Sequence, residues 1–465
     1  MSWLTELQQL PEGVAETTEL LSQLDQCFLT GFARLGQSHL DSLAALERIY
    51  AGTPLAEPLR ESIAALTRSE FLEQHFCMLA AARASLQGAQ YTTLQRHLHT
   101  ALGRTPAAHT DAPDSTSAEP TSWHDSTRHW LMELALAGFG QLETSTIEPF
   151  KTTLSQLQTE PSQFAQSTLL TNFVNELLRT SIANPEDVPL YRWVDLWTRA
   201  MIGTMHESPT LASKLVSGTL YPLGVDLRQH AFTASVVVYA MLVQGDDVQG
   251  DDVQTVRITL STYKVDAIRG DELWLMFPQI EPLLNGLATS KSVNVTDVPL
   301  LPSGDLLWPD ADNMAGVSTG KTYNLLTEAA SWFAADADDA TCFDAITPID
   351  RHPIHVAELI FLQDYKVVDG VVTMGDDTLS IAREHLPALS DLTDAEIKKS
   401  NRMVGLLRFD GNQWWVQPLL VAKQSGKTKP KPVFIGLKGL KLLQKPPKSS
   451  VVETLTERAS RLLRG

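Results

Sequence analysis

The segment of the chain with the clearest chemical signature is AGVSTGKT, residues 315–322. In one register it matches a phosphate-binding loop, with Gly320, Lys321 and Thr322 at the positions that contact phosphate and Mg²⁺. In another register it matches G-x-S-x-G, which places Ser318 where a hydrolase carries its nucleophile. One segment cannot hold both structures, so the flanking residues must decide between them.

Both motifs need a buried strand that leads into a sharp turn, and the preceding residues do not predict one. Residues 303–314, SGDLLWPDADNM, are rich in proline, aspartate and asparagine turn formers. Residues 322–333 have a helical pattern, which favours Ser318 or Thr319 as the N-cap of a helix. We therefore expect neither chemistry, and we keep nucleotide binding through 315–322 as an alternative.

Residues of catalytic and metal-binding type also occur at 350–358. Asp350, His352 and His355 follow Ser318 in the chain order of a hydrolase triad, and His352, His355 and Glu358 are of zinc-binding type. A proline separates the two histidines and a strand pattern follows, so residues three apart point to opposite faces. We expect no metal site here.

The acidic repeat QGDDVQGDDVQ, residues 244–254, could suggest calcium. It lacks the alternating ligands and terminal glutamate of a calcium loop, and it lies between two strand patterns. A polar hairpin connection is the preferred interpretation, so no cofactor is predicted. The acids concerned are Asp246, Asp247, Asp251 and Asp252.

A lysine-rich segment at 423–448 contains no acidic residue. The chain has a formal net charge of −18, yet residues 423–465 hold eight Lys and three Arg against two Glu, a local +9 that leaves −27 elsewhere. Such a run could protect an edge strand, meet an acidic protein or bind nucleic acid. Phe434 is its only aromatic residue, which argues against stacking on single strands. The candidate partner contacts are Lys427, Lys429, Lys431, Lys438 and Lys441.

Two tryptophans lie on one predicted helix. In LYRWVDLWTRAM, residues 190–201, Trp193 and Trp197 fall on a continuous apolar stripe at helical spacing. A core helix is the preferred interpretation, and a partner-binding helix is the alternative because aromatic residues dominate interfaces.

The spacing of apolar residues divides the chain into a helical N-terminal half and a mainly antiparallel C-terminal half, an α+β fold. We predict a helical domain at 1–104, a flexible linker at 105–125 and a second helical domain at 126–224. An α+β domain follows at 225–448, and an amphipathic helix at 449–465.

The two helical blocks match at an offset of 107 residues. FLTGFARLGQS then aligns with ALAGFGQLETS, so that Gly31 meets Gly138 and Phe32 meets Phe139. Either a duplicated helical unit or the shared composition of amphipathic helices explains this match.

Strand patterns dominate the C-terminal half. Residues 232–243, FTASVVVYAMLV, suggest a buried strand, and Asp-Gly pairs predict hairpins at 365–374 and 406–421.

Composition and cysteine usage bear on the compartment. The start of the chain has acids where an export signal has basic residues, and no apolar run reaches the roughly 20 residues of a membrane helix. The three cysteines lie far apart, without a Cys-x-x-Cys pair. We expect a soluble protein of the reducing cytoplasm.

The segment LYRWVDLWTRAM and the order of helical front, mixed back and basic end resemble uncharacterised bacterial proteins that accompany MoxR-type AAA+ ATPases and von Willebrand A-domain proteins. This resemblance implies a cytoplasmic accessory protein of an ATP-driven system, with an AAA+ ATPase or von Willebrand A-domain protein as partner. The expected function is that of a non-enzymatic adaptor. Nucleotide binding and nucleic-acid binding are the alternatives.

Overall fold

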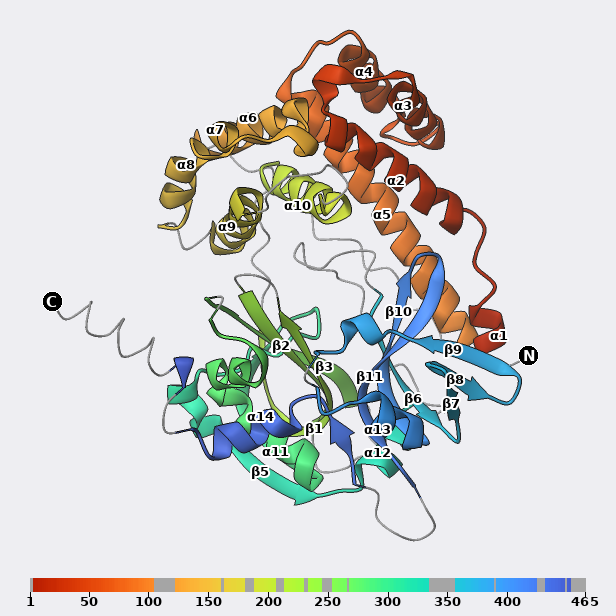
Figure 1. Cartoon of the computed structure of the whole chain (residues 1–465), viewed down its shortest axis with the longest axis vertical. Helices are drawn as coiled ribbons and strands as arrows, with labels where there is room; N and C mark the ends of the chain where they lie inside the picture. The colour runs from red at the N-terminus through yellow and green to blue at the C-terminus, as the bar shows by residue number, and fades with distance from the viewer. Residues whose placement is uncertain are drawn as a thin grey trace, which may run out of the picture.

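The protein has an α+β fold in which a helical N-terminal region precedes mainly antiparallel sheets (Figure 1). The computed structural model describes residues 3–103, 122–159, 163–179, 188–205, 213–229, 233–244, 253–265, 267–333, 356–388, 390–424, 431–447 and 450–452. Predicted features at 104–121 and 453–465, which hold most of the linker and of the C-terminal helix, lie outside these ranges.

Ten α-helices are described in the N-terminal region; α2 to α10 form an arc above the sheets, and α1 lies beside strand β9, Asp377–Ile381 (Figure 1). They are α1 Trp3–Leu7, α2 Val14–Thr30, α3 Gln37–Ile49, α4 Ala56–Thr67, α5 Glu73–Ala101, α6 Ser122–Ala137, α7 Thr144–Ile147, α8 Phe150–Leu157, α9 Phe164–Arg179 and α10 Leu190–Gly203.

The same order of elements recurs at the offset of 107 residues. When 107 is added to the residue numbers of the helices from α2 to α5, α2 overlaps α6, α3 overlaps α7 and α8, α4 overlaps α9, and α5 overlaps α10. The short 3₁₀ helix η1, Phe32–Arg34, falls on η2, Phe139–Gln141, residue for residue. The element boundaries therefore agree with a repeated helical unit.

The equivalent glycines of the two units also touch each other. Gly31 has φ 93° and ψ 140°, and Gly138 has φ 87° and ψ 135°, a conformation that favours glycine. A Cβ on Gly138 would lie 2.6 Å from the Gly31 nitrogen. Arg34 donates a hydrogen bond to Gln141, its own equivalent. The two units thus meet through corresponding residues, and only glycine allows their backbones to approach so closely.

A buried charged cluster pairs two helices of the first unit and reaches α10 of the second. Arg83 on α5 is fully buried and donates from Nε and Nη2 to the Asp25 carboxylate on α2, at 2.8 and 2.9 Å. On α10, Asp195 lies 3.9 Å from Nη1 of Arg83, and Thr198 lies 3.5 Å from it. Burial lowers the pKa of Arg83, but Asp25 and Asp195 more than offset this, so the net pKa is raised. The guanidinium stays charged and holds three helices together.

The first sheet has five antiparallel strands in the order β3-β2-β1-β4-β5. The second has seven, in the order β6-β10-β11-β9-β8-β7 with β12 beside β11, and its pairings are antiparallel except that of β9 with β11. The strands are β1 Lys214–Gln229, β2 Thr233–Val243, β3 Val253–Tyr263, β4 Lys291–Leu300, β5 Val317–Thr322, β6 Glu358–Gln363, β7 Lys366–Val368, β8 Val371–Met374, β9 Asp377–Ile381, β10 Arg402–Asp410, β11 Gln413–Ala422 and β12 Val433–Phe434.

Four further α-helices pack around these sheets, namely α11 Glu281–Thr289, α12 Leu325–Trp332, α13 Asp394–Lys399 and α14 Leu437–Gln444. The 3₁₀ helices of this half are η5 Gly270–Met276, η6 Pro278–Ile280, η7 Ala311–Gly316 and η8 Arg383–His385.

Both predicted hairpins form, with one difference. In β7–β8, Asp369 and Gly370 take the positive φ values of a two-residue turn, as expected. In β10–β11 these positions belong to Gly411 and Asn412, because Asp410 is still paired within the strand.

Two predicted boundaries were wrong. The second helical domain was predicted to extend to residue 224, but strand β1 begins at Lys214, so residues 214–224 are extended and not helical. Helix α6 begins at Ser122, within the predicted linker.

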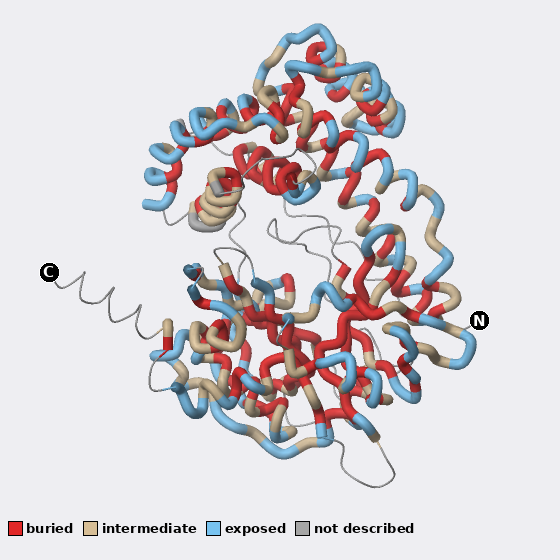
Figure 2. The backbone as a smooth tube through the Cα atoms, in the orientation of Figure 1, coloured by how far each residue is buried: buried red, intermediate tan, exposed pale blue. Residues whose placement is uncertain are grey.

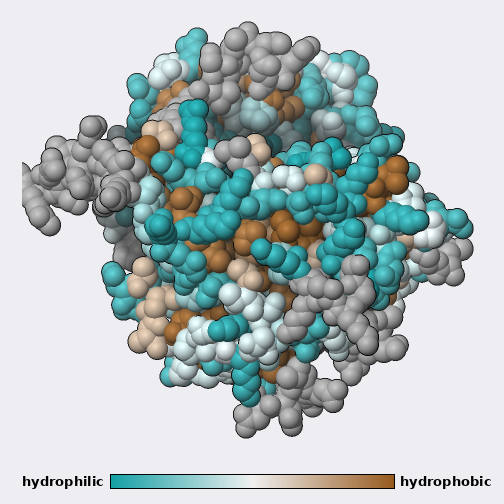
Figure 3. Space-filling view, turned by 60° about the horizontal axis from the view of Figure 1, so that its bottom comes forward, coloured by the Kyte–Doolittle hydropathy of each residue, from teal (hydrophilic) through white to brown (hydrophobic). Residues whose placement is uncertain are grey.

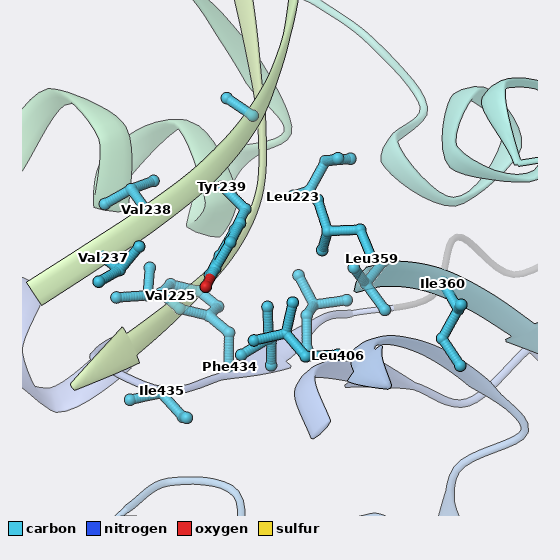
Figure 4. Packing of buried hydrophobic residues seen from close by; sticks show 14 of the residues in the cluster. Leu223, Val225, Val237, Val238, Tyr239, Leu359, Ile360, Leu406, Phe434 and Ile435 are labelled. Atoms are coloured by element: carbon cyan, nitrogen blue, oxygen red, sulfur yellow. The ribbon is translucent and has the colours of Figure 1, made fainter. Parts of the chain in front are cut away.

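The described residues form two hydrophobic cores (Figure 2). One lies among the helices, and the other lies between and around the sheets, where Leu223 and Tyr239 of the first sheet pack near Leu359 and Leu406 of the second (Figure 4). Helix α5 contributes to both cores. No helix in the described residues is long and apolar enough to cross a membrane.

Candidate functional site

Helix α14 presents a row of lysines on its outer face. Lys438, Lys441 and Lys445 stand at positions i, i+3 and i+7, so they share one side of the helix and its end, and all three are exposed. Lys431, just before β12, is exposed too. We call Lys438, Lys441 and Lys445 the lysine face.

The opposite side of α14 is fixed against η5. A Cβ on Gly439 would lie 2.4 Å from the Trp274 indole, and one on Gly436 would lie 2.7 Å from it. The two glycines therefore let the helix rest directly on the ring. Gln444 donates a hydrogen bond of 3.0 Å to Glu281 on α11. The backbone N–H of Lys438 donates one of 2.8 Å to Asp391. Helix α14 is thus anchored on both flanks, which sets the direction of its lysines.

The surface seen when the bottom of Figure 1 is turned forward is mainly hydrophilic, with smaller hydrophobic areas between the polar ones (Figure 3). Phe434, the one ring of the lysine-rich segment, is buried. The segment therefore offers no aromatic platform on which bases could stack. Lys427 and Lys429 lie outside the described residues.

The segment 315–322 is not a loop at a helix start. Residues 317–322 form β5, the outer strand of the first sheet, paired with β4. Gly320, Lys321 and Thr322 all lie in this strand, and a Cβ on Gly320 would lie 2.3 Å from Ser292 Oγ. Ser318 and Thr319 are exposed strand residues, so the predicted N-cap was wrong; Asn324 precedes α12 instead. The residues before β5 form the exposed η7, as the turn-rich sequence suggested.

Of the three candidate metal ligands, only Glu358 lies within the described residues. Glu358 opens β6 and is buried. His352 and His355 lie outside the described residues, as do Asp350 and the four aspartates of the acidic repeat. Within the described ranges, no group of three His, Cys, Asp or Glu side chains is placed to hold a metal ion.

Trp193 and Trp197 are core residues. Both are 0% exposed, and the Trp197 indole N–H donates to the Leu131 carbonyl at 2.8 Å. Their rings pack edge to face on phenylalanines of the helical core, Trp197 on Phe28 and Trp193 on Phe139. Neither indole reaches the surface, so the partner-binding interpretation does not hold for this stripe.

Sequence reasoning missed an open hollow of about 760 Å³ on the helical region. Its wall is rich in sulfur, and Cys77 Sγ lies 3.7 Å from Met201 Sδ beneath it. Its charged residues are engaged with one another, since Glu73 lies 3.4 Å from His129 and 3.9 Å from Arg128. We therefore take the lysine face, whose three lysines are exposed, as the candidate site.

No protein-family model matches the chain, and no curated protein matches it either.

Proposed function

We propose that this protein is a non-enzymatic adaptor that binds an acidic protein surface through the lysine face of α14. The observation that carries the proposal is the alignment of Lys438 and Lys441 on one exposed side of α14, with the exposed Lys445 at its C-cap, on a helix that Trp274 fixes from beneath. An anchored helix loses little conformational freedom on binding, so its charges act at a lower entropic cost.

Charge complementarity favours an acidic protein as the occupant. The local +9 at residues 423–465 stands against −27 for the rest of the chain. That acidic remainder repels a long polyanion such as nucleic acid, whereas a compact acidic patch can meet the lysine face alone. The buried position of Phe434 also counts against nucleic acid. The resemblance of LYRWVDLWTRAM suggests that the partner is an AAA+ ATPase or a von Willebrand A-domain protein of the same cytoplasm.

The test is affinity purification followed by mass spectrometry with two triple variants of equal charge. Lys438, Lys441 and Lys445 are changed to glutamine in the first variant. The matched control changes the exposed strand lysines Lys214, Lys291 and Lys366 to glutamine. We expect an acidic partner to co-purify with the wild type and the control and to be depleted with the α14 variant. Binding of the isolated partner should weaken as salt rises, chiefly through slower association.

Equal recovery of the partner by both variants would contradict the proposal. A parallel titration with single-stranded and duplex oligonucleotides tests the alternative. If oligonucleotides bind in a salt-sensitive way and only the α14 variant loses this binding, the ligand of the lysine face is nucleic acid and not an acidic protein.

A further inference from the structure

A charged cluster lies where the two sheets pack face to face. Asp226 on β1 accepts from Arg228 Nε at 2.8 Å and from Gln417 Nε2 on β11 at 2.8 Å. Arg408 on β10 places Nη2 3.4 Å from the same carboxylate. It also donates from Nε and Nη2 to Gln417 Oε1, at 2.9 and 2.6 Å. The cluster thus joins β1 of the first sheet to β10 and β11 of the second.

The close approach of the sheets explains why these groups are buried. Alternation along β1 puts Gly224, Asp226 and Arg228 on one face. A Cβ on Gly224 would lie 2.5 Å from the Leu419 side chain on β11, so the two sheets touch directly beside the cluster. Asp226 and Gln417 are buried in consequence.

The cluster contains more positive than negative charge. Two guanidinium groups, Arg228 and Arg408, share the single carboxylate of Asp226, and in the described part of the chain neither forms an ion pair with another acid. Burial lowers the pKa of Arg408 by more than Tyr239 and Asp226 raise it, and the charge of Arg228 adds a smaller decrease. Burial, followed by the charge of Arg408, also lowers the pKa of His385 on η8, which keeps this imidazole neutral near pH 7. A net charge of about +1 therefore remains in the cluster, and one of its two cations, Arg408, is largely desolvated.

The cluster reaches solvent at Arg228 and His385. The Arg228 side chain is 44% exposed and that of His385 is 38% exposed, whereas that of Arg408 is 8% exposed. Glu384, at the rim, lies 3.9 Å from His385 Nε2 and points its charge outward, 65% exposed. The inner guanidinium uses Nε and Nη2 in its hydrogen bonds, and Nη1 takes part in none among the described residues. The cluster thus combines an accessible cation, Arg228, with a buried cation, Arg408, whose Nη1 remains available to donate within the described ranges.

We propose that this cluster binds a small oxyanion, either a carboxylate or a phosphate group, between Arg228 and Arg408. Guanidinium groups bind both with paired N–H···O bonds, and the bound anion would neutralise the excess charge. The neutral imidazole of His385 can donate one more N–H at the rim. The proposal is independent of the lysine face, which lies on another element.

Isothermal titration calorimetry with inorganic phosphate and, separately, with acetate tests this, with chloride keeping the ionic strength constant. Arg228→Gln removes the exposed cation. Arg383→Gln is the matched control, because Arg383 is an exposed arginine at the start of η8 that pairs with Asp394 instead. We expect the wild type and the control to bind at least one probe. Arg228→Gln should bind that probe with an affinity lower by about tenfold or more, as for the loss of a charged hydrogen bond.

Tighter binding of phosphate than of acetate would assign the ligand as a phosphate group, and the reverse order would assign a carboxylate. Absence of binding for both probes at about 10 mM in the wild type would overturn the proposal. Equal affinities of the wild type and Arg228→Gln would overturn it as well. Circular dichroism of each variant shows whether its fold is intact. Arg408→Lys, which keeps the inner charge but loses the fork, should also weaken binding.

Discussion

Removal of Asp25 tests how the buried charged cluster around Arg83 stabilises the packing of helices α2, α5 and α10. In Asp25→Ala the guanidinium of Arg83 loses both hydrogen bonds to its carboxylate partner while it stays fully buried. Arg83 cannot avoid the penalty by losing its proton near neutral pH, since Arg remains charged in proteins. The nearest remaining acid is Asp195, 3.9 Å from Nη1. An uncompensated buried cation follows from a single substitution.

The loss of one partner from a buried pair costs about 3–5 kcal/mol of unfolding free energy. Asp195 compensates in part, and the Tyr191 ring, with its centroid 5.7 Å from the guanidinium carbon, adds a cation–π contact. We therefore expect Asp25→Ala to lower the unfolding free energy by about 3 kcal/mol, the lower end of that range.

Urea unfolding followed by far-ultraviolet circular dichroism measures this loss. The control is Glu57→Ala, which deletes the partner of Arg60 in an exposed pair on α4 and should leave the midpoint unchanged. The double variant Asp25→Ala/Arg83→Met should regain much of the stability, because it removes the buried charge itself. If Asp25→Ala unfolded at the same urea concentration as Glu57→Ala, the ion pair would not hold the helices together and the reasoning would fail.

Three further outcomes are expected. Gly138→Ala should lower the thermal unfolding midpoint more than Gly13→Ala does. The two glycines have similar φ values, 87° at Gly138 and 86° at Gly13, but only at Gly138 would a Cβ meet backbone atoms, at 2.6 Å. Equal decreases of the midpoint would argue against close packing of the two units. Iodoacetamide at about pH 8 should leave Cys27 and Cys77 unmodified in the folded protein, because burial raises the pKa of the Cys27 thiol to about 12 and that of the Cys77 thiol to about 11. Peptide mass spectrometry measures the labelling, and rapid modification of either cysteine would refute the prediction. Lys321→Ala should leave ATP and GTP binding and hydrolysis at the wild-type level, because Lys321 lies in an edge strand; turnover that depends on Lys321 would restore the phosphate-loop interpretation.

The helical pattern predicted the N-terminal region well because its apolar stripes are regular. On α10, Trp193, Leu196, Trp197, Ala200 and Met201 are all buried, as the spacing indicated. The match at an offset of 107 residues aligns Gly31 with Gly138, the two positions at which close backbone contact requires glycine. A steric requirement of this kind can be read from the sequence, because it restricts the position to glycine.

Strand β1 was missed over its first eleven residues because its pattern is irregular. It contains Gly218, Pro222 and Gly224, residues that usually interrupt a strand. Two register shifts, between Val216 and Gly218 and between Pro222 and Gly224, accommodate them, and pairing with β2 and β4 on both sides keeps the strand extended. Long-range pairing of this kind is invisible in a local window.

The same limit explains β5 and the lysine face. The polar segment 317–322 has no strand pattern of its own and is extended because it pairs with β4. The lysines of 423–448 were recognised as a charged run, but their alignment depends on α14, whose Gly439 disfavours a helix in isolation. Contact with Trp274, distant in sequence, makes that glycine favourable. The candidate site could thus be predicted by charge and not by geometry.

Helix α5 connects the two halves more firmly than a linker would. Its 29 residues span about 44 Å, and its buried apolar residues up to Leu86 belong to the helical core, whereas those from Leu94 onward belong to the sheet core. Between them, Gln90 donates to the Val14 carbonyl at 3.0 Å and ties the middle of α5 to α2. A rotation between the two halves would have to bend this helix or expose one of its buried ends, and either change costs free energy. The arc of helices and the sheets that carry the lysine face should therefore behave as one mechanical unit, so a partner held by one half is presented in a fixed orientation to the other.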